Sequence, residues 1–303
     1  MYKNKTIVEY FILIGFSHTP ELQILVFVVV LFVYLLIFGG NMMILKLICF
    51  ERHLHTPMYF YLANLSIVDI SFTTSVLHKI FTSFITGDKT VLFYECMIQS
   101  FVAGSFTIHE LYILTAMSYD RYVAICIPLR YQLVMNQRTY ITLASLCFLL
   151  GFLFVSPPAW LLSSFTCYTS IEVNHFFCDV ILLMKMSCSD TSILDILLFI
   201  EGWLLFSVFP FFLTFVPYIF IIVAIMKIRT TMGRSKAFYT CSSHLTIVIL
   251  LYTINIIQYL IPSNLDYEKL YTLINTVVVP LLNPLIYSLK NKDIKNSLMR
   301  SMP

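Results

Sequence analysis

Long apolar segments constrain this 303-residue chain more than any other feature of its sequence. A helix needs about 20 mainly apolar residues to cross the hydrocarbon core of a bilayer. Seven stretches meet this requirement, near residues 22–49, 57–80, 96–121, 138–162, 195–227, 236–261 and 268–289. Because little chain remains outside them, we expect a single domain, residues 1–303, folded as an all-α integral membrane bundle of seven transmembrane helices.

The composition excludes a soluble fold. Hydrophobic residues make up 59% of the chain and charged residues only 12%, with a mean hydropathy of +0.86. Soluble domains carry roughly twice that charged fraction. The net charge of +3 gives no indication of a nucleic-acid partner. We therefore expect a lipid membrane around the protein and no nucleic acid bound to it.

The distribution of basic residues predicts the orientation. Thirteen of the 19 Lys and Arg fall on one side of the predicted spans, and this side should be cytoplasmic. Residues 1–21 would then be extracellular and residues 290–303 a cytoplasmic tail. The Asn4-Lys5-Thr6 sequon agrees, since glycosylation requires a lumenal Asn. In the tail, Ile294 and Leu298 follow helical spacing among basic residues, which predicts a short amphipathic helix after the seventh span.

Four of the eight cysteines fall on the predicted outer side, and three of them lie in the long connection 162–194. They are Cys96, Cys167, Cys178 and Cys188. Thiols in an oxidising compartment usually pair, so two disulfides are expected. The residues alone leave all three pairings open.

Two carboxylates fall deep inside predicted spans. Asp69 and Glu110 both lie roughly 16–18 Å from the cytoplasmic end of their helices, at about 1.5 Å per residue. Charges at that depth are costly, so each needs a reason. The pair could share a proton or hold a cation, with Asn41 and Asn283 within reach of the same polar column. The alternative is that all four only supply hydrogen bonds between helices.

A charged pair also closes the third span. Asp120-Arg121, within "MSYDRYVAIC", ends an apolar run at the predicted cytoplasmic boundary. The pair could be a latch that opens when helices move and exposes a docking site. It could equally be an ordinary ion pair at the membrane interface.

Several long motifs occur in a fixed order along the chain. They are Gly40-Asn41, "LHTPMYFYLANLSIVD" (54–69), "MSYDRYVAIC" (117–126), "SCSDT" (187–191), "KAFYTCSSHL" (236–245) and "PLLNPLIYSLKN" (280–291). Together they resemble the signature of the odorant receptors, within the rhodopsin-like, or class A, G-protein-coupled receptors. The resemblance covers nearly the whole chain. Departures are Tyr239, Thr253 and Pro217, of which the first and last flank the presumed G-protein cavity and so bear on coupling efficiency.

The resemblance implies roles for these residues. It favours Cys96–Cys178 and Cys167–Cys188 as the disulfides, with Cys96–Cys188 as an alternative. By this resemblance, Asp69 and Glu110 correspond to the carboxylates of a sodium site. Asn41 and Asn283 would belong to the same buried polar relay. The predicted activation switch and G-protein contact comprise Asp120, Arg121 and Tyr122, with Tyr218, Tyr252 and Tyr287 as partners.

By analogy with the family, the ligand would bind in the outer half of the bundle. The candidate residues are Gly104, Thr107, Ile108, Phe206, Ser207, Asn255, Ile256, Tyr259 and Thr276. An apolar pocket wall with one or two polar groups suits a small ligand. The alternative is that these residues only pack between helices. No acid or base is clearly placed for a charged ligand, which favours neutral odorants; Glu201 is the one reservation.

The family further implies a small volatile odorant as ligand and a stimulatory olfactory G protein that raises cAMP. The expected location is the plasma membrane of olfactory cilia, with helper proteins assisting surface delivery. We expect no catalytic residues, since no Ser-His or metal-ligand spacing accompanies Asp69 and Glu110. The competing classes are a channel or transporter, and a membrane enzyme.

Overall fold

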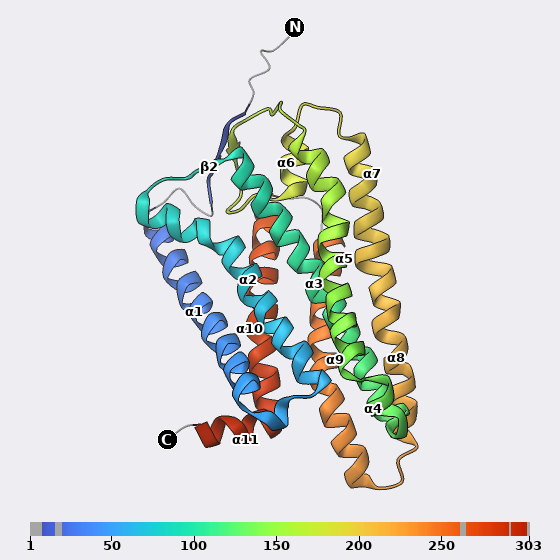
Figure 1. The fold of residues 1–303 in the computed structure, drawn as a ribbon. Helices are drawn as coiled ribbons and strands as arrows, with labels where there is room; N and C mark the ends of the chain where they lie inside the picture. The colour runs from blue at the N-terminus through green and yellow to red at the C-terminus, as the bar shows by residue number, and fades with distance from the viewer. Residues whose placement is uncertain (1–7, 16–19, 261–264, 291, 302–303) are drawn as a thin grey trace.

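The computed structural model describes residues 8–15, 20–260, 265–290 and 292–301. Within them, seven long helical segments run side by side between two ends of the molecule (Figure 1). Six of them are the single helices α1 (Pro20–Phe50), α2 (Pro57–Thr86), α3 (Phe93–Cys126), α5 (Gln137–Ser163), α9 (Thr231–Leu260) and α10 (Leu265–Lys290). The seventh, between α5 and α9, is a continuous run of α7 (Ser192–Ile200), the π-helical segment η3 (Glu201–Val208) and α8 (Phe209–Met226). This arrangement confirms the predicted seven-helix class.

Six of these segments are long and apolar enough to cross a membrane. They leave large apolar side chains such as Phe32, Trp203 and Phe220 more than half exposed, which a soluble surface rarely does over a wide area. The exception, α3, is equally long but carries His109 and Glu110 in its middle, and it packs against α2, α5 and α8. Lipid therefore covers the outer helices, while the polar groups of α3 are enclosed by protein.

Local sequence signals set several helix ends. Pro57 is the first residue of α2. Proline has no N–H, and an N–H at this position would have no partner within the helix. The same helix stops at Gly87, whose φ of 74° is a left-handed conformation that glycine adopts without strain. At the start of α5, the Asn136 side chain accepts a hydrogen bond from the Thr139 N–H over 3.1 Å.

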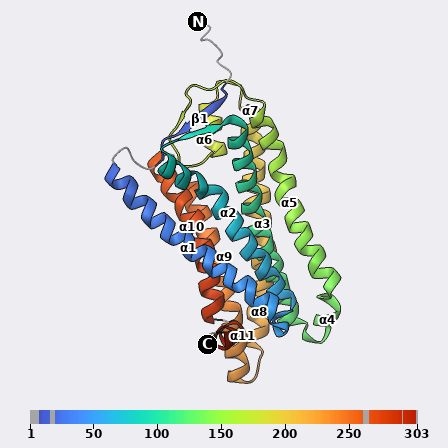
Figure 2. The ribbon, with the colours of Figure 1, turned by 60° about the vertical axis from the view of Figure 1, so that its left-hand side comes forward.

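A small three-stranded sheet closes one end of the bundle (Figure 2). Its central strand β1 (Tyr10–Leu13) pairs antiparallel with β2 (Thr90–Leu92) and parallel with β3 (Glu172–Val173). Short helix α6 (Val180–Met186) lies beside it. We call this the sheet end. The all-α prediction contains no strands, so the sheet is an addition to the predicted fold.

Two disulfides fix the sheet end. Cys96 at the start of α3 bonds to Cys178, and Cys167 bonds to Cys188, with Cα–Cα distances of 5.3 and 5.4 Å. Of the three pairings that the residues leave open, this is the one that the resemblance favours. The alternative Cys96–Cys188 bond is not formed.

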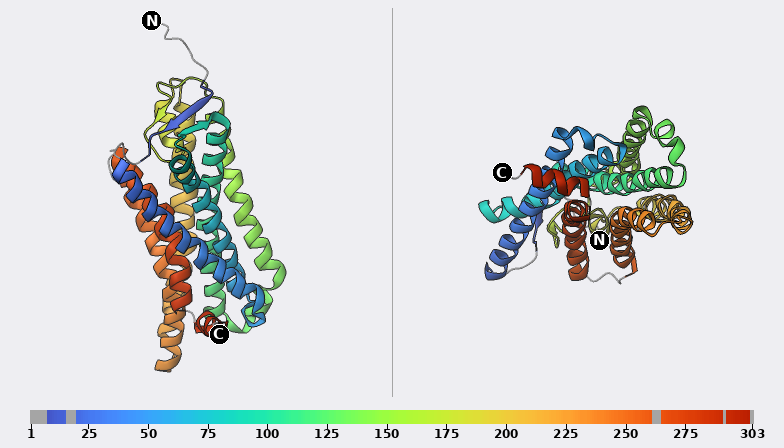
Figure 3. Two further views of the ribbon diagram at one scale, coloured as in Figure 1. Left: turned by 90° about the vertical axis from the view of Figure 1, so that its left-hand side faces the viewer. Right: turned by 90° about the horizontal axis from the view of Figure 1, so that it is seen from below.

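We call the opposite end the α11 end. It carries three short helical elements within connections, η1 (Arg52–Leu54), η2 (Pro128–Arg130) and α4 (Tyr131–Val134), and the terminal helix α11 (Lys292–Ser301). Helix α11 lies across the bundle end when seen from below (Figure 3), and it buries Ile294 completely. The predicted amphipathic helix after the seventh span is therefore present.

Helices α3 and α5 lie very close together at Gly151. A Cβ atom at this position would lie 2.6 Å from the Ser105 backbone oxygen of α3. Only glycine fits there without moving a backbone. This contact holds α5 against the part of α3 that bears the candidate site.

Candidate functional site

A cavity of about 330 Å³ lies in the sheet-end half of the bundle. Side chains of α3, α5, η3, α9 and α10 surround it, and residues 177–181 of the long connection cover it. The Cys96–Cys178 bond ties that cover to α3. The volume lies at the lower end of the range for ligand pockets, roughly 300–1,000 Å³, so a small molecule would fit.

Most of the cavity wall is apolar. Its apolar members include Phe72, Val76, Phe101, Ile108, Phe154, Val155, Pro158, Phe177, Leu198 and Leu205. A few polar groups interrupt this wall, among them Thr107, Asn255, Asn275 and Thr276. Such a surface binds an apolar body and fixes its orientation at a small number of points.

Five of the nine predicted ligand residues line this cavity: Gly104, Thr107, Ile108, Asn255 and Thr276. Ser207 is not among the residues that line it; its hydroxyl donates to the Gly202 carbonyl oxygen over 2.7 Å within the π-helical segment η3. A role for Ser207 in ligand binding stays a prediction. The side chains of Phe206, Ile256 and Tyr259 lie outside the described residues.

The part of the cavity wall that α2 and α5 contribute is not predicted from the sequence. Phe72 and Val76, one turn apart on α2, face the cavity, as do Phe154, Val155 and Pro158 of α5. The four-residue spacing of Phe72 and Val76 predicts only that they share a helix face. Which neighbour that face meets depends on the tilt of α2, which the sequence does not encode locally.

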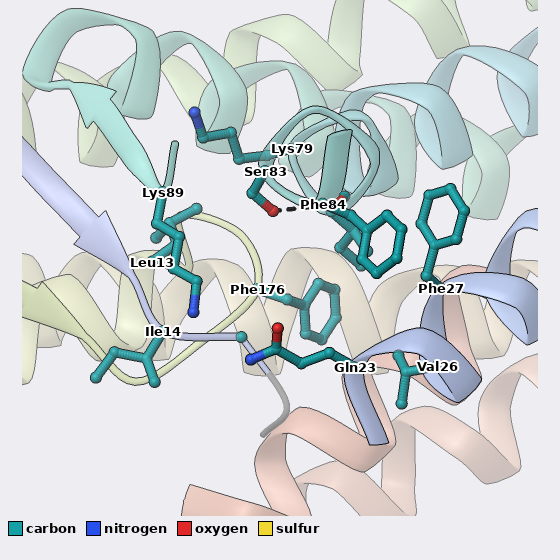
Figure 4. Close-up of a pocket in the computed structure, with 12 residues that line it drawn as sticks. Leu13, Ile14, Gln23, Val26, Phe27, Lys79, Ser83, Phe84, Lys89 and Phe176 are labelled. Carbon is teal, nitrogen blue, oxygen red and sulfur yellow. Dashed lines mark hydrogen bonds between the residues drawn. The ribbon is translucent and has the colours of Figure 1, made fainter. Parts of the chain in front are cut away.

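A smaller pocket, of about 70 Å³, lies among α1, α2 and the sheet. Figure 4 shows Lys79 and Lys89 on one side of it and Phe27, Phe84 and Phe176 on the other. Phe27 stacks on Phe84 with a centroid distance of 3.9 Å. This pocket is too small to enclose an organic ligand, so the larger cavity is the better candidate.

A buried polar cluster lies deeper in the bundle. The Asn283 amide donates to Oδ2 of Asp69 over 2.9 Å, joining α10 to α2. Glu110 of α3 lies close enough to both to interact with them. The Asn41 amide donates to the Pro280 carbonyl oxygen over 3.1 Å, one turn from Asn283 on α10. The structure thus brings the four predicted relay residues to one level.

This cluster has free oxygen ligands. Oδ1 of Asn41, Oδ1 of Asp69, Oε1 of Glu110 and Oδ1 of Asn283 are buried and accept no hydrogen bond from the described part of the chain. Carboxylate and amide oxygens are the ligands that a hard cation prefers. The donor set therefore fits a sodium ion.

At the α11 end, the predicted switch residues form a closed arrangement. Arg121 Nη2 lies 2.5 Å from Oδ2 of the fully buried Asp120. The Tyr131 hydroxyl of α4 donates to Oδ1 of the same carboxylate over 2.8 Å. Burial and the Asp120 carboxylate raise the pKa of Tyr131, so the hydroxyl stays protonated and keeps donating. The Asp120 carboxylate therefore accepts hydrogen bonds from both Arg121 and Tyr131.

Tyr218 and Tyr287 lie close enough to Arg121 to interact with it, whereas Tyr252 packs farther along α9. Tyr218 of α8 is hydrogen-bonded to the His244 ring of α9 rather than to Arg121, a partner that the sequence analysis misses. Tyr287 is buried nearby on α10. Tyr252 packs its ring against Phe211 and Phe215, with centroid distances of 5.5 Å to each. Tyr122 packs edge-on against Phe220.

The structure is thus a seven-helix bundle with a cavity at the sheet end and a closed polar arrangement at the α11 end. Squid rhodopsin aligns with the structure at a TM-score of 0.72 and 17% sequence identity, over 95% of this chain and 83% of that one. That likeness supports the fold.

Sequence comparisons give the family. The olfactory receptor family model matches residues 30–303. Human olfactory receptor 5B12 is 39% identical over 99% of this chain and 96% of its own length. Mouse olfactory receptor 5AR1 is 41% identical over 97% of this chain and 95% of its own length. The chain therefore belongs to the olfactory receptor family, whose members are membrane receptors and not enzymes.

Proposed function

We propose that the larger cavity binds a small, mostly apolar volatile odorant and that binding activates a stimulatory olfactory G protein, raising cAMP. The observation that carries this proposal is the cavity itself, which is largely apolar and is lined by Asn255 of α9. The same helix carries His244, which holds Tyr218 of α8 near the Asp120–Arg121 pair. A ligand that contacts α9 can therefore influence the closed end.

The proposed mechanism is a two-state switch. A ligand shifts the equilibrium only by its differential affinity for the two states. Contact at Asn255 favours a position of α9 in which Tyr252 shifts against Phe211 and Phe215. An outward swing of the α11 end of α9 breaks the Tyr218–His244 bond. Arg121 then leaves Asp120, and a G-protein helix enters the opened space.

We propose that the sheet end faces the exterior. Both disulfides lie there, as expected of an oxidising compartment. The predicted glycosylation site Asn4 lies outside the described residues. The location would be the plasma membrane of olfactory cilia, reached with the help of trafficking proteins. Tags at both chain ends, probed before and after permeabilisation, test the orientation; two tags on one side would contradict it.

The buried cluster is the proposed sodium site. Asp69 and Glu110 would supply negative charge, and Asn41 and Asn283 neutral oxygens. The ion would balance two carboxylates that otherwise repel each other. In this proposal the cluster stabilises the closed receptor by joining α1, α2, α3 and α10.

The decisive experiment replaces Arg121 by Ala and measures odorant-evoked cAMP in cells with and without the stimulatory G protein. We expect the response to disappear while surface expression persists. Replacement of the exposed Arg52 on η1 is the matched control and should leave the response near wild type. A full response from the Arg121 variant would refute the latch. An odorant-evoked current without G protein would favour a channel.

A further inference from the structure

Glu201 is one of two acidic residues in the wall of the largely apolar cavity. It is the first residue of the π-helical segment η3, between α7 and α8. Segments of π-helix are rare and often mark functional sites, because the extra residue redirects the side chains on that turn. Ser207 turns its hydroxyl back to Gly202 in the same segment. Glu201 therefore lines the cavity where the regular helix geometry is interrupted.

The Glu201 carboxylate has no protein partner in the described residues. The ion pairs found there are His53–Glu51 and Arg121–Asp120, and no side chain donates a hydrogen bond to Glu201. A half-buried carboxylate beside an apolar wall is unfavourable unless something compensates its charge. A cationic group of a ligand bound in the cavity would compensate this charge.

The described wall of the cavity holds no cation. None of its residues is Lys, Arg or His, whereas both Asp179 and Glu201 belong to it. One oxygen of Asp179 already accepts the Leu182 N–H over 3.0 Å, as the N-cap of α6. The electrostatic character of the cavity is thus negative and repels an acidic ligand.

A second polar group faces the same space. Asn255 is only 8% exposed and lines the cavity. Buried amides are normally hydrogen-bonded, and a ligand in the cavity can supply such a bond. Its oxygen can accept an N–H that Glu201 does not use, since an alkylammonium carries up to three donors.

We infer that the cavity selects a primary or secondary amine with a compact apolar body. The ammonium binds Glu201 and Asn255, and the apolar body packs against the aromatic and aliphatic wall. A neutral alcohol could donate one hydrogen bond to Glu201, but charge-assisted bonds are roughly twice as strong. This inference rests on the proposed function, because it names the ligand class of the same cavity, and it revises the sequence-based expectation of neutral odorants.

The test uses sets of probes with one skeleton and different head groups. Cyclohexylamine, cyclohexanol and cyclohexanecarboxylic acid form one set; isopentylamine, isopentanol and isovaleric acid form another. Two readouts are recorded: cAMP in cells, and the thermal midpoint of the purified receptor in nanodiscs. Amines with a pKa of about 10 are protonated at pH 7. We expect an amine to act at concentrations at least about tenfold below those of its alcohol.

Substitutions identify the anchor. Glu201→Gln keeps the shape and removes the charge, and should raise the amine EC50 at least about tenfold while changing responses to alcohols about threefold or less. Glu201→Asp should retain part of the amine response. Asp195→Asn removes an exposed carboxylate from neighbouring α7 and is the matched control. Surface expression is measured for every variant.

The outcomes separate the two proposals. Amine-induced stabilisation without cAMP would support this inference and contradict the proposed signalling. Responses confined to alcohols or acids would overturn the inference and leave the odorant-receptor proposal intact. An amine response unchanged in Glu201→Gln would also overturn it, and so would the absence of stabilisation by every amine tested.

Discussion

Asn283 donates its side-chain amide to the Asp69 carboxylate over 2.9 Å, and this bond joins α10 to α2 in the centre of the bundle. Asp69 is completely buried, and its other oxygen accepts no hydrogen bond from the described residues. The Asn283 bond is therefore the direct protein contact that offsets the cost of burying this carboxylate.

Replacing Asn283 by Ala should lower the stability of the receptor. The change leaves a buried carboxylate without its donor, for which a loss of about 1–3 kcal/mol is expected, or more if the group stays charged. The thermal midpoint of the purified receptor measures this loss. Asn64→Ala is the control, because within the described residues the Asn64 amide donates to the Phe60 carbonyl oxygen of its own helix. Equal midpoints for the two variants would contradict the role given to Asn283.

The sequence predicts this cluster well for a physical reason. Helix length and a fixed rise of about 1.5 Å per residue place Asp69 and Glu110 at one depth, whatever the details of packing. The bilayer also penalises charge strongly, so polar residues in the spans must meet one another. The seven helices follow from the same constraint, and the structure confirms them.

Features that depend on distant contacts were not predictable in this way. Strand β1 has four residues, and its partners lie near residues 91 and 172. Ser207 lies in a π-helical segment and is not among the residues that line the cavity, and the sequence contains no local signal for that geometry. His244 was missed as the partner of Tyr218 because the pairing depends on how α8 meets α9.

Replacing Tyr131 by Phe should raise basal signalling. The Tyr131 hydroxyl is one of the groups that hold the Asp120 carboxylate in the closed arrangement. Hydrogen bonds to a charged group contribute about 1.5–3 kcal/mol, enough to change a two-state equilibrium several-fold. Ligand-free cAMP, normalised to surface expression, measures the effect. Tyr140→Phe leaves the ring contact with Phe60 and is the control. Unchanged basal cAMP in Tyr131→Phe would show that the hydroxyl does not restrain the switch.

The two disulfides should affect ligand response differently. Cys96–Cys178 holds the cover of the cavity against α3, and Cys178 itself lines the cavity. Cys167–Cys188 closes a local loop of the same connection, with a sequence separation of 21. Removing a native disulfide typically costs about 2–5 kcal/mol. We expect lower surface expression in both paired Cys→Ser variants, with a larger rise in odorant EC50 among surviving receptors for Cys96/Cys178. Equal EC50 values would indicate that the cover does not shape the binding cavity.

Gly151→Ala tests whether the contact between α3 and α5 is as close as the structure indicates. The added Cβ would lie 2.6 Å from the Ser105 backbone oxygen, far inside van der Waals contact, so the helices must separate. Overpacking of this kind typically costs about 1–3 kcal/mol. We expect a lower thermal midpoint and, because α5 also forms the cavity wall at Val155 and Pro158, a weaker odorant response. Gly39→Ala is the control, since its Cβ would meet nothing within 4 Å and alanine favours the helix. A Gly151 variant as stable as the Gly39 variant would mean that the two helices lie farther apart than described.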